Sequence, residues 1–449
     1  MKTPLPIRTS CACLLLLVVV LLRPAVSAAI PAPPPEVAEA VRQWLADPTT
    51  KAPGIAVAAV DASGLLWSGA FGLADVAQKR PATTATRWQM ASITKVYTTL
   101  MLAQLAQEGR IDLDAPLTRY LPEFQPRFPE PGAPPLTLRR LASHTSGFTN
   151  GWGQSNHSYS LEQLLAWTRA AGLTAQPGLQ HQYSNTGFSL VGAAMERATG
   201  RTYADLLRDR VLRPLHLDAS GLTTLPPHPD LATSYWMQEG KLVPRPASPL
   251  FDAQTPASSL VATVEDIGRF AQAHLAEGPA APIPDAVKDL LFTAAVPAGE
   301  ATAIGLGWHY TWRENLPYWY HIGAWNYFYS RIVVRPDVGV GLVLSTNGPW
   351  TRDLIAPLLR ILAAQADTRR LDALTGDYVD PAGKVFTVRR PPGPELMLEL
   401  AGVGRLLPLS RHTFRVHTGV GNSGNWIRFV TENGKKVMLW DTRQLVRRE

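Results

Sequence analysis

Cysteine is nearly absent from this sequence of 449 residues, which has only two, Cys11 and Cys13, close to its start. Both lie in a segment that we predict to be a cleaved targeting signal. Without it the chain has no thiol, which excludes cysteine nucleophiles, disulfides and thiolate metal sites. A chain of this length can bury enough apolar surface to fold without disulfides, and its 46% hydrophobic content is that of a globular protein.

Several motifs that identify enzyme classes are also missing. The sequence has no GxxxxGK[ST] loop, no HExxH helix and no His/Cys pair at metal-ligand spacing, so we expect no cofactor and no metal. No GxSxG elbow occurs, which argues against an α/β-hydrolase. One GxGxxG occurs at 419–424, but it leads to a strand-like run at Trp426 rather than to a helix. We therefore interpret it as a hairpin turn, since dinucleotide binding needs a helix N-terminus.

The first 28 residues have the organisation of a signal peptide. Lys2 and Arg8 precede an apolar run at 11–22, and small residues follow at 26–28. Twelve residues of helix span about 18 Å, which is short of the roughly 30 Å of a bilayer core. We expect cleavage after residue 28 and an exported protein, periplasmic or secreted; an uncleaved anchor is the alternative.

Positive charge is concentrated towards the C-terminus. The net charge of +7 falls to +4 without the three basic residues of the signal. Residues 366–449 alone carry fourteen basic and nine acidic side chains. We interpret this as a solvated surface of mixed charge, with weak contact to an anionic cell envelope as the alternative. The basic residues do not cluster with aromatics, so we expect no nucleic-acid partner. The pattern gives no indication of the oligomeric state.

Hydrophobic periodicity divides the rest of the chain into three parts. We expect a Pro-rich spacer at 29–35, an α+β domain at 36–365 and a small β-rich domain at 366–449. In the α+β domain we expect helices at 36–47, 92–107 and 353–365, and strands at 55–60, 65–71, 331–335 and 338–344. In the C-terminal domain we expect short strands at 385–388, 396–400, 414–416, 426–430 and 436–440.

Ser92 and Lys95 form the most informative local pattern. Three residues apart on a helix, they share one face, so the amine can contact the hydroxyl. A desolvated lysine can be neutral and accept the serine proton. A helix-start serine followed by a surface lysine is the structural alternative, but Val96 and Leu100 make the surroundings of Lys95 apolar.

Two further segments carry candidate site residues. Tyr183 and Asn185 lie in a loop before an apolar segment; a phenol near a lysine can be held partly as phenolate and shuttle protons, and the amide can position substrate. His321, Gly323 and Ala324 precede a predicted strand, where the Ala324 N–H could pair with that of Ser92 as an oxyanion hole. Taken singly, the tyrosine and the histidine are as readily explained as core residues.

In this order and spacing, the three segments resemble the serine β-lactamase and penicillin-binding-protein superfamily, in particular its branch of class C β-lactamases, DD-peptidases and related esterases. The resemblance covers about residues 36–365. Short sequence motifs similar to those of that branch occur at 71–75 (FGLAD), 141–147 (LASHTSG), 212–215 (LRPL), 305–308 (GLGW) and 344–347 (LSTN).

The resemblance implies an antiparallel sheet flanked by helices, with an all-helical insertion. It also implies that Ser92 is the acylated nucleophile, Lys95 its base and Tyr183 the proton relay. Asn185, His321, Gly323 and Ala324 would bind substrate, with the oxyanion held by the Ser92 and Ala324 amides. His144, in the LASHTSG motif, is usually structural in the family and is not placed in the site.

Ile322 departs from the family pattern. Threonine is frequent at this position in relatives, and its hydroxyl can bond the carboxylate of β-lactams and D-Ala peptides. Loss of such a bond is worth about 1.5–3 kcal/mol. Aromatic residues at 318–320, Trp325 and Tyr327 could line the cleft for an apolar acyl group or could fill the core. In an extended strand Trp319 would face away from its two neighbours.

These observations favour an exported serine hydrolase of an ester or amide with modest charge. β-Lactam hydrolysis or D-Ala-D-Ala-type carboxypeptidase activity is the alternative. A second class of function is a non-catalytic acyl-binding sensor, which the bulky Tyr327 could support. The expected substrates are small-molecule esters, amides, β-lactams or peptides, among which the motifs do not discriminate.

Overall fold

The computed structural model describes residues 29–47, 49–148, 159–246, 252–293, 296–299, 302–313, 316–349, 353–366, 368–393, 396–408, 412–418 and 422–448. The predicted signal peptide, with Cys11 and Cys13, lies outside these residues. Among the described helices, none combines the length and the apolar character needed to cross a bilayer.

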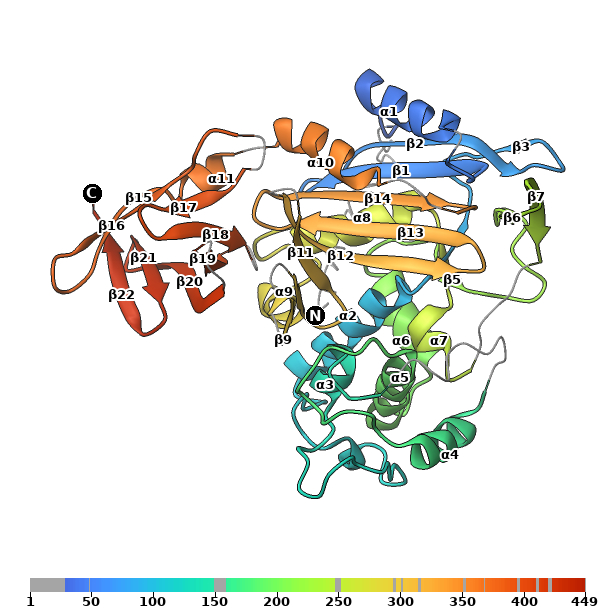
Figure 1. Ribbon diagram of the computed structural model, residues 1–449, viewed down its shortest axis with the longest axis horizontal. Helices are drawn as coiled ribbons and strands as arrows, with labels where there is room; N and C mark the ends of the chain where they lie inside the picture. The colour runs from blue at the N-terminus through green and yellow to red at the C-terminus, as the bar shows by residue number, and fades with distance from the viewer. Residues whose placement is uncertain are drawn as a thin grey trace, which may run out of the picture.

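A nine-stranded antiparallel sheet organises the larger part of the chain (Figure 1). Its order is β3-β2-β1-β14-β13-β12-β11-β10-β9, so the inner pair β1 and β14 joins the two ends of this part, with Ile55 opposite Thr346. The strands are β1 (Gly54–Asp61), β2 (Leu65–Asp75), β3 (Arg80–Pro81), β9 (Val296–Gly299), β10 (Thr302–Ile304), β11 (His309–Arg313), β12 (Leu316–Trp325), β13 (Phe328–Arg335) and β14 (Val340–Thr346).

Both faces of this sheet are buried, which explains why β1 is apolar throughout. Ile55 and Val57 face one core, whereas Ala56 and Ala58 face the other. The first core lies under α1 (Pro35–Ala46) and α10 (Ile355–Ala364), and the second lies under α2 (Thr94–Gln107) and α8 (Val264–Leu275). The sheet is therefore the middle layer between two layers of helices.

The segment between β3 and β9 is mostly helical, as the resemblance implied, but it also carries short strands. Its other helices are η1 (Leu117–Arg119), α3 (Leu138–Ala142), α4 (Leu161–Ala171), α5 (Asn185–Thr199), α6 (Tyr203–Leu207), η2 (Arg208–Leu212), α7 (Thr255–Ser258) and α9 (Asp285–Phe292). Its strands are β4 (Trp88–Ala91), β5 (Gly221–Leu222) and β8 (Leu260–Ala262) in one sheet, and β6 (Ser234–Gln238) and β7 (Lys241–Arg245) in a hairpin.

After α11 (Arg369–Asp372) the chain forms a closed eight-stranded barrel, drawn in orange to red in Figure 1. The strands are β15 (Gly376–Val379), β16 (Val385–Arg389), β17 (Leu398–Leu400), β18 (Gly404–Pro408), β19 (Thr413–His417), β20 (Asn422–Glu432), β21 (Lys435–Trp440) and β22 (Arg443–Arg447). Pairing of β15 with β22 closes the barrel. The α+β class and the small C-terminal β-domain are thus confirmed. Residues 419–421 of the GxGxxG segment lie outside the described residues.

The Pro-rich segment at 29–35 was expected to be a spacer, but its described residues contact the sheet. The Pro31 carbonyl accepts a hydrogen bond from the Ser68 N–H of β2 at 3.0 Å. A Cβ on Gly69 would overlap the Pro33 ring, so the two segments approach closely there. The helix α1 then begins at Pro35, where a fixed φ suits the first helical turn.

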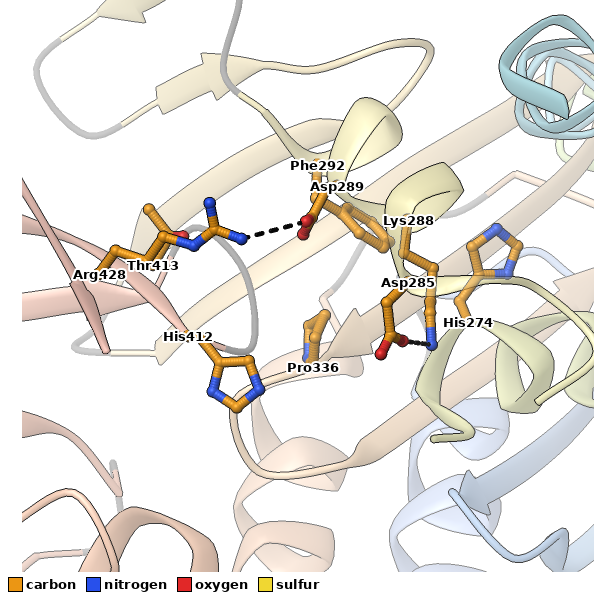
Figure 2. A pocket seen from close by; sticks show the side chains of 9 residues that line it. All are labelled: His274, Asp285, Lys288, Asp289, Phe292, Pro336, His412, Thr413 and Arg428. Carbon is orange, nitrogen blue, oxygen red and sulfur yellow. Dashed lines mark hydrogen bonds and ion pairs between the residues drawn. The ribbon is translucent and has the colours of Figure 1, made fainter. Parts of the chain in front are cut away.

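The barrel is joined to the rest of the protein through a buried hydrogen bond and an exposed ion pair. Arg335, at the end of β13, contacts Asp337 at 2.6 Å and the Leu396 carbonyl at 3.1 Å. Arg428 of β20 contacts Asp289 of α9 at 3.5 Å beside a cavity of about 170 Å³ between α9 and the barrel (Figure 2). Arg335 is 1% exposed, whereas the side chains of Arg428 and Asp289 are about half exposed.

This difference predicts unequal effects on stability. Arg335→Leu is expected to lower the free energy of unfolding by about 3–5 kcal/mol, because it leaves the buried Asp337 carboxylate without its partner. Arg428→Ala, which removes the exposed pair, is expected to lower the free energy of unfolding by less than about 1 kcal/mol. Urea denaturation of both variants measures the two values, and similar values would contradict this account.

Candidate active site

Ser92 lies at the turn between β4 and α2. Ala91 adopts a positive φ of 46°, and the helix begins at Thr94 rather than at Ser92 as we expected. The Thr94 hydroxyl donates to the Ala91 carbonyl at 2.6 Å and accepts from the Leu260 N–H at 2.9 Å, so it ties this turn to β8. The turn holds Ser92 at the N-terminus of α2, where the helix dipole favours negative charge.

Lys95 and Tyr183 both contact the Ser92 hydroxyl. The contact of Lys95 was predicted from its spacing to Ser92. The Lys95 Nζ lies 3.0 Å from Ser92 Oγ, and the Tyr183 hydroxyl donates to the same oxygen at 2.8 Å. Lys95 Nζ also donates to the Ala257 carbonyl at 2.8 Å. Two segments far apart in the sequence thus meet at one oxygen atom, and a third segment contacts the lysine beside it.

The protonation states of this group follow from burial. Lys95 is 0% exposed, and desolvation lowers the pKa of its amine well below the usual value. A neutral amine has two hydrogens and one lone pair; with one hydrogen on Ala257, the lone pair can turn to the Ser92 proton. Burial raises the pKa of Tyr183, so its phenol is protonated. This differs from the partial phenolate that we expected, and it makes Tyr183 a proton donor.

The substrate-binding candidates divide between two faces of β12. Gly323 is buried, and a Cβ there would overlap the Met90 carbonyl, so glycine permits β12 to pass close to β4 and Ser92. Ala324 follows it, exposed, on the opposite face, together with Ile322, which is 40% exposed. Asn185 is the first residue of α5, two positions after Tyr183. The Ile322 side chain thus offers apolar surface at the position where the family resemblance led us to expect a hydroxyl.

His321 lies on the buried face of β12 and is 1% exposed. Its Nδ1 lies 2.9 Å from the Ile322 carbonyl, so Nδ1 carries a proton and Nε2 carries the lone pair. Burial lowers the pKa of this ring well below the usual value, and the imidazole is neutral. Whereas His321 was proposed to bind substrate, its ring is buried 5.2 Å from that of His309 in the neighbouring β11 and is close enough to Lys95 to be influenced by its charge.

The aromatic residues of this strand mainly fill the core. Trp319 packs at 5.3 Å from Phe292 in one core, whereas Tyr318 and Tyr320 contact each other at 5.7 Å on the opposite face. This confirms that Trp319 faces away from its neighbours. Tyr327, at the tip of the β12–β13 hairpin, has a positive φ of 63° and lies 6.1 Å from Trp236 of β6.

His144, which the sequence analysis left outside the site, holds Tyr183 on both sides. Its carbonyl accepts the Gln182 N–H at 2.6 Å, and its Nδ1 accepts the Ser184 N–H at 3.1 Å. Its ring also lies 4.3 Å from the Tyr183 ring. His144 is fully buried and has a positive φ of 56°. The LASHTSG motif contains this residue, but the contact between His144 and Tyr183 cannot be predicted from the sequence.

We expect His144→Ala to lower kcat by about 10- to 100-fold with little change in KM. The variant leaves the buried Ser184 N–H without an acceptor, which is worth about 1–3 kcal/mol, and frees the Tyr183 ring. His144→Asn offers an amide oxygen to the same N–H and should retain more activity than the alanine variant. Steady-state kinetics of the pair test this, and equal loss in both would argue against the role of the hydrogen bond.

Comparison with known proteins gives a consistent result. The Beta-lactamase family model matches residues 37–366. Penicillin-binding protein 4 of Amycolatopsis lactamdurans is 30% identical over 323 residues, which are 67% of this chain and 82% of that protein. Protein flp of Staphylococcus aureus (strain N315) is 25% identical over 66% of this chain, which spans only 59% of that relative. The octameric penicillin-binding protein homologue from Pyrococcus abyssi superposes with a TM-score of 0.63 and 20% identity, over 92% of this chain and 99% of that one.

Proposed function

Because the chain belongs to the β-lactamase family and is a serine hydrolase of that group, we propose that it cleaves ester or amide bonds through an acyl-enzyme on Ser92. The observation that carries this proposal is the shared contact of Lys95 and Tyr183 with Ser92 Oγ, at 3.0 and 2.8 Å. A nucleophile, a neutral base and a proton donor are thereby present on one oxygen.

In the proposed acylation, Ser92 Oγ attacks the substrate carbonyl carbon, and its proton passes to the neutral Lys95 amine. The Ser92 and Ala324 N–H groups would hold the resulting oxyanion. As the carbon–oxygen or carbon–nitrogen bond breaks, the leaving group takes the Tyr183 proton, and Tyr183 recovers a proton from the Lys95 ammonium. In deacylation, water attacks the acyl carbonyl while the same pair removes its proton, and Ser92 regains its hydrogen.

The exposed Ile322 supports substrates whose end near β12 has no negative charge. An isoleucine cannot hydrogen-bond a carboxylate, and burial of an unpaired charge against it is unfavourable. Short-chain esters or amides fit this surface better than β-lactams or D-amino-acid peptides. The relationship to a penicillin-binding protein favours β-lactam or peptide recognition as the second candidate.

Substrate preference and the Ile322→Thr variant test the proposal together. We expect the protein to hydrolyse short-chain p-nitrophenyl esters with little turnover of a chromogenic cephalosporin. Ile322→Thr should raise kcat/KM for the cephalosporin by about 10- to 100-fold and leave that of the esters within about twofold, because it restores a hydrogen bond to a carboxylate.

Two results would contradict this assignment. Fast cephalosporin cleavage by the unmodified protein would identify a β-lactamase. Stoichiometric acylation by either substrate without repeated turnover would instead favour the sensor function. Ile322→Val, which changes the size of the side chain but adds no hydroxyl, is the matched control.

We also propose that residues 1–28 direct export of the protein. The basic start, the apolar run at 11–22 and the small residues at 26–28 support this. N-terminal sequencing of the exported protein should then give Ala29 as its first residue, and an intact Met1 would favour the membrane anchor.

A further inference from the structure

Three histidines from distant parts of the sequence meet beside the proposed catalytic group. They are His144 after α3, His309 of β11 and His321 of β12. One ring nitrogen of each lies within 4.8 Å of the corresponding nitrogens of the other two. The ring centroid of His309 lies 6.0 Å from that of His144 and 5.2 Å from that of His321.

The surroundings of these rings leave nitrogen atoms without partners. His321 Nδ1 is paired with the Ile322 carbonyl, whereas its buried Nε2 has no hydrogen-bond partner. His144 Nε2 is likewise buried without a partner. Burial also keeps the three imidazoles neutral, as it lowers the pKa of His309 to about 4. His321 thus has the usual form of a metal-bound histidine, a neutral imidazole whose other nitrogen donates to a carbonyl.

The size of the cluster fits a transition metal after small ring movements. Zinc–nitrogen bonds of about 2.0–2.1 Å in a tetrahedral site place ligand nitrogens about 3.3 Å apart, so each nitrogen would move inward by roughly 1 Å. Three imidazoles suit Zn²⁺, Cu²⁺ or Ni²⁺ better than Mg²⁺ or Ca²⁺, which prefer oxygen ligands. The trio leaves one tetrahedral position for water or another small ligand.

We propose that His144, His309 and His321 bind Zn²⁺ or a similar divalent transition metal and that this binding inhibits the hydrolase. The inhibitory part rests on the proposed function of Ser92, Lys95 and Tyr183, whereas the binding part does not.

Inhibition follows from the hydrogen bonds of His144. A neutral imidazole has one N–H and one lone pair, and the Ser184 N–H already occupies the lone pair at Nδ1. Nε2 therefore carries the proton. To bind a metal through Nε2, the ring must move this proton to Nδ1, where it then opposes the Ser184 N–H. The metal and the hydrogen bond that holds the Tyr183 segment thus compete for one imidazole.

The charge of the metal adds to this effect. Lys95 is close enough for its charge to influence all three histidines. A divalent cation at the cluster would therefore oppose formation of the Lys95 ammonium, which acylation requires. Both effects lower kcat, and neither needs the metal to contact the substrate.

The test uses the purified full-length protein after treatment with a chelator, with Zn²⁺ or Co²⁺ alone as the probe. We expect one equivalent of Zn²⁺ to remain after gel filtration, and Co²⁺ to give the intense visible absorption of a tetrahedral complex. Ester hydrolysis should fall at least tenfold on addition of Zn²⁺ and recover with chelator.

His309→Phe keeps an aromatic ring but removes a ligand, so it should lower Zn²⁺ affinity at least 100-fold, abolish the Co²⁺ spectrum and relieve inhibition. His144→Asn provides a second test, because it keeps an acceptor for Ser184 and removes the metal ligand. His228→Gln, at a half-exposed histidine outside the cluster, is the matched control and should bind as the unmodified protein does.

Unchanged Zn²⁺ affinity in both His309→Phe and His144→Asn would overturn the site, and full activity of the zinc-loaded protein would overturn its inhibitory role. The Co²⁺ spectrum separates these results from a failure of the proposed function. A spectrum that depends on the three histidines in a protein without hydrolase activity would retain the site and reject the reaction.

Discussion

Ser92→Ala is expected to lower kcat for acyl substrates by about 10⁶-fold, the magnitude seen when a serine hydrolase loses its nucleophile. The variant keeps Lys95 and Tyr183 in place but leaves no oxygen that can form the acyl-enzyme. Substrate binding should change little, because the oxyanion N–H groups belong to the backbone. Burst kinetics with a p-nitrophenyl ester would show the loss of the acyl-enzyme as well as the loss of turnover, since the burst reports one acylation for each active site.

A matched variant separates this effect from general damage. Ser63→Ala lies in the exposed turn between β1 and β2, where the serine hydroxyl donates to the Asp61 carboxylate, and should leave hydrolysis unchanged. If Ser92→Ala kept more than about one hundredth of the activity, water attack without an acyl-enzyme would have to replace the mechanism proposed above.

Lys95→Met is expected to lower kcat by about 10⁴-fold, near the upper limit for loss of a general base. Methionine fills a similar volume without an amine, so the apolar packing of α2 is preserved. Lys95→Arg is the control for charge: the guanidinium stays protonated and cannot take the Ser92 proton, so it should not rescue activity. Recovery of activity in the arginine variant would show that Lys95 acts only through its charge.

The same substitution should change how stability depends on pH. Burial lowers the pKa of Lys95, so above that pKa the folded protein holds a neutral amine while the unfolded chain still binds the proton. The free energy of unfolding should therefore rise with pH from the lowered pKa of Lys95 up to its usual value of 10.5, by up to about 1.4 kcal/mol per unit. This rise should be absent in Lys95→Met. The buried histidines, whose pKa values are also lowered, contribute a similar rise only below their usual value of about 6.5.

Local patterns predicted most of the elements and two of the three residues of the proposed catalytic group. The apolar run at 55–60 became β1 (Gly54–Asp61), and the segment 92–107 became α2 (Thr94–Gln107), because strand and helix periodicity depend on neighbours in sequence. Lys95 follows Ser92 within one helical turn, so their contact was predictable from spacing. Tyr183 could be related to them only through the family resemblance, since no local rule brings a loop 91 residues away to Ser92.

The features that the sequence did not reveal all depend on tertiary pairing. Closure of the barrel requires Tyr378 to pair with Arg447, and the histidine cluster requires the loop at His144 to meet β11 and β12. The burial of His321 was accessible in principle. Alternation along an extended strand places it on the same face as Trp319, which is the buried face.

The pairing of β1 with β14 has a consequence for how the protein is made. Ile55 pairs with Thr346, so a ribosome has to add nearly 300 residues after β1 before the nine-stranded sheet can be completed. Contacts of such high order fold slowly, and until then the apolar β1 has β2 on one side but lacks β14 on the other. We therefore expect the nine-stranded sheet to be completed only after β14 has been synthesised. A polypeptide truncated before β14 should aggregate rather than accumulate as a partial enzyme.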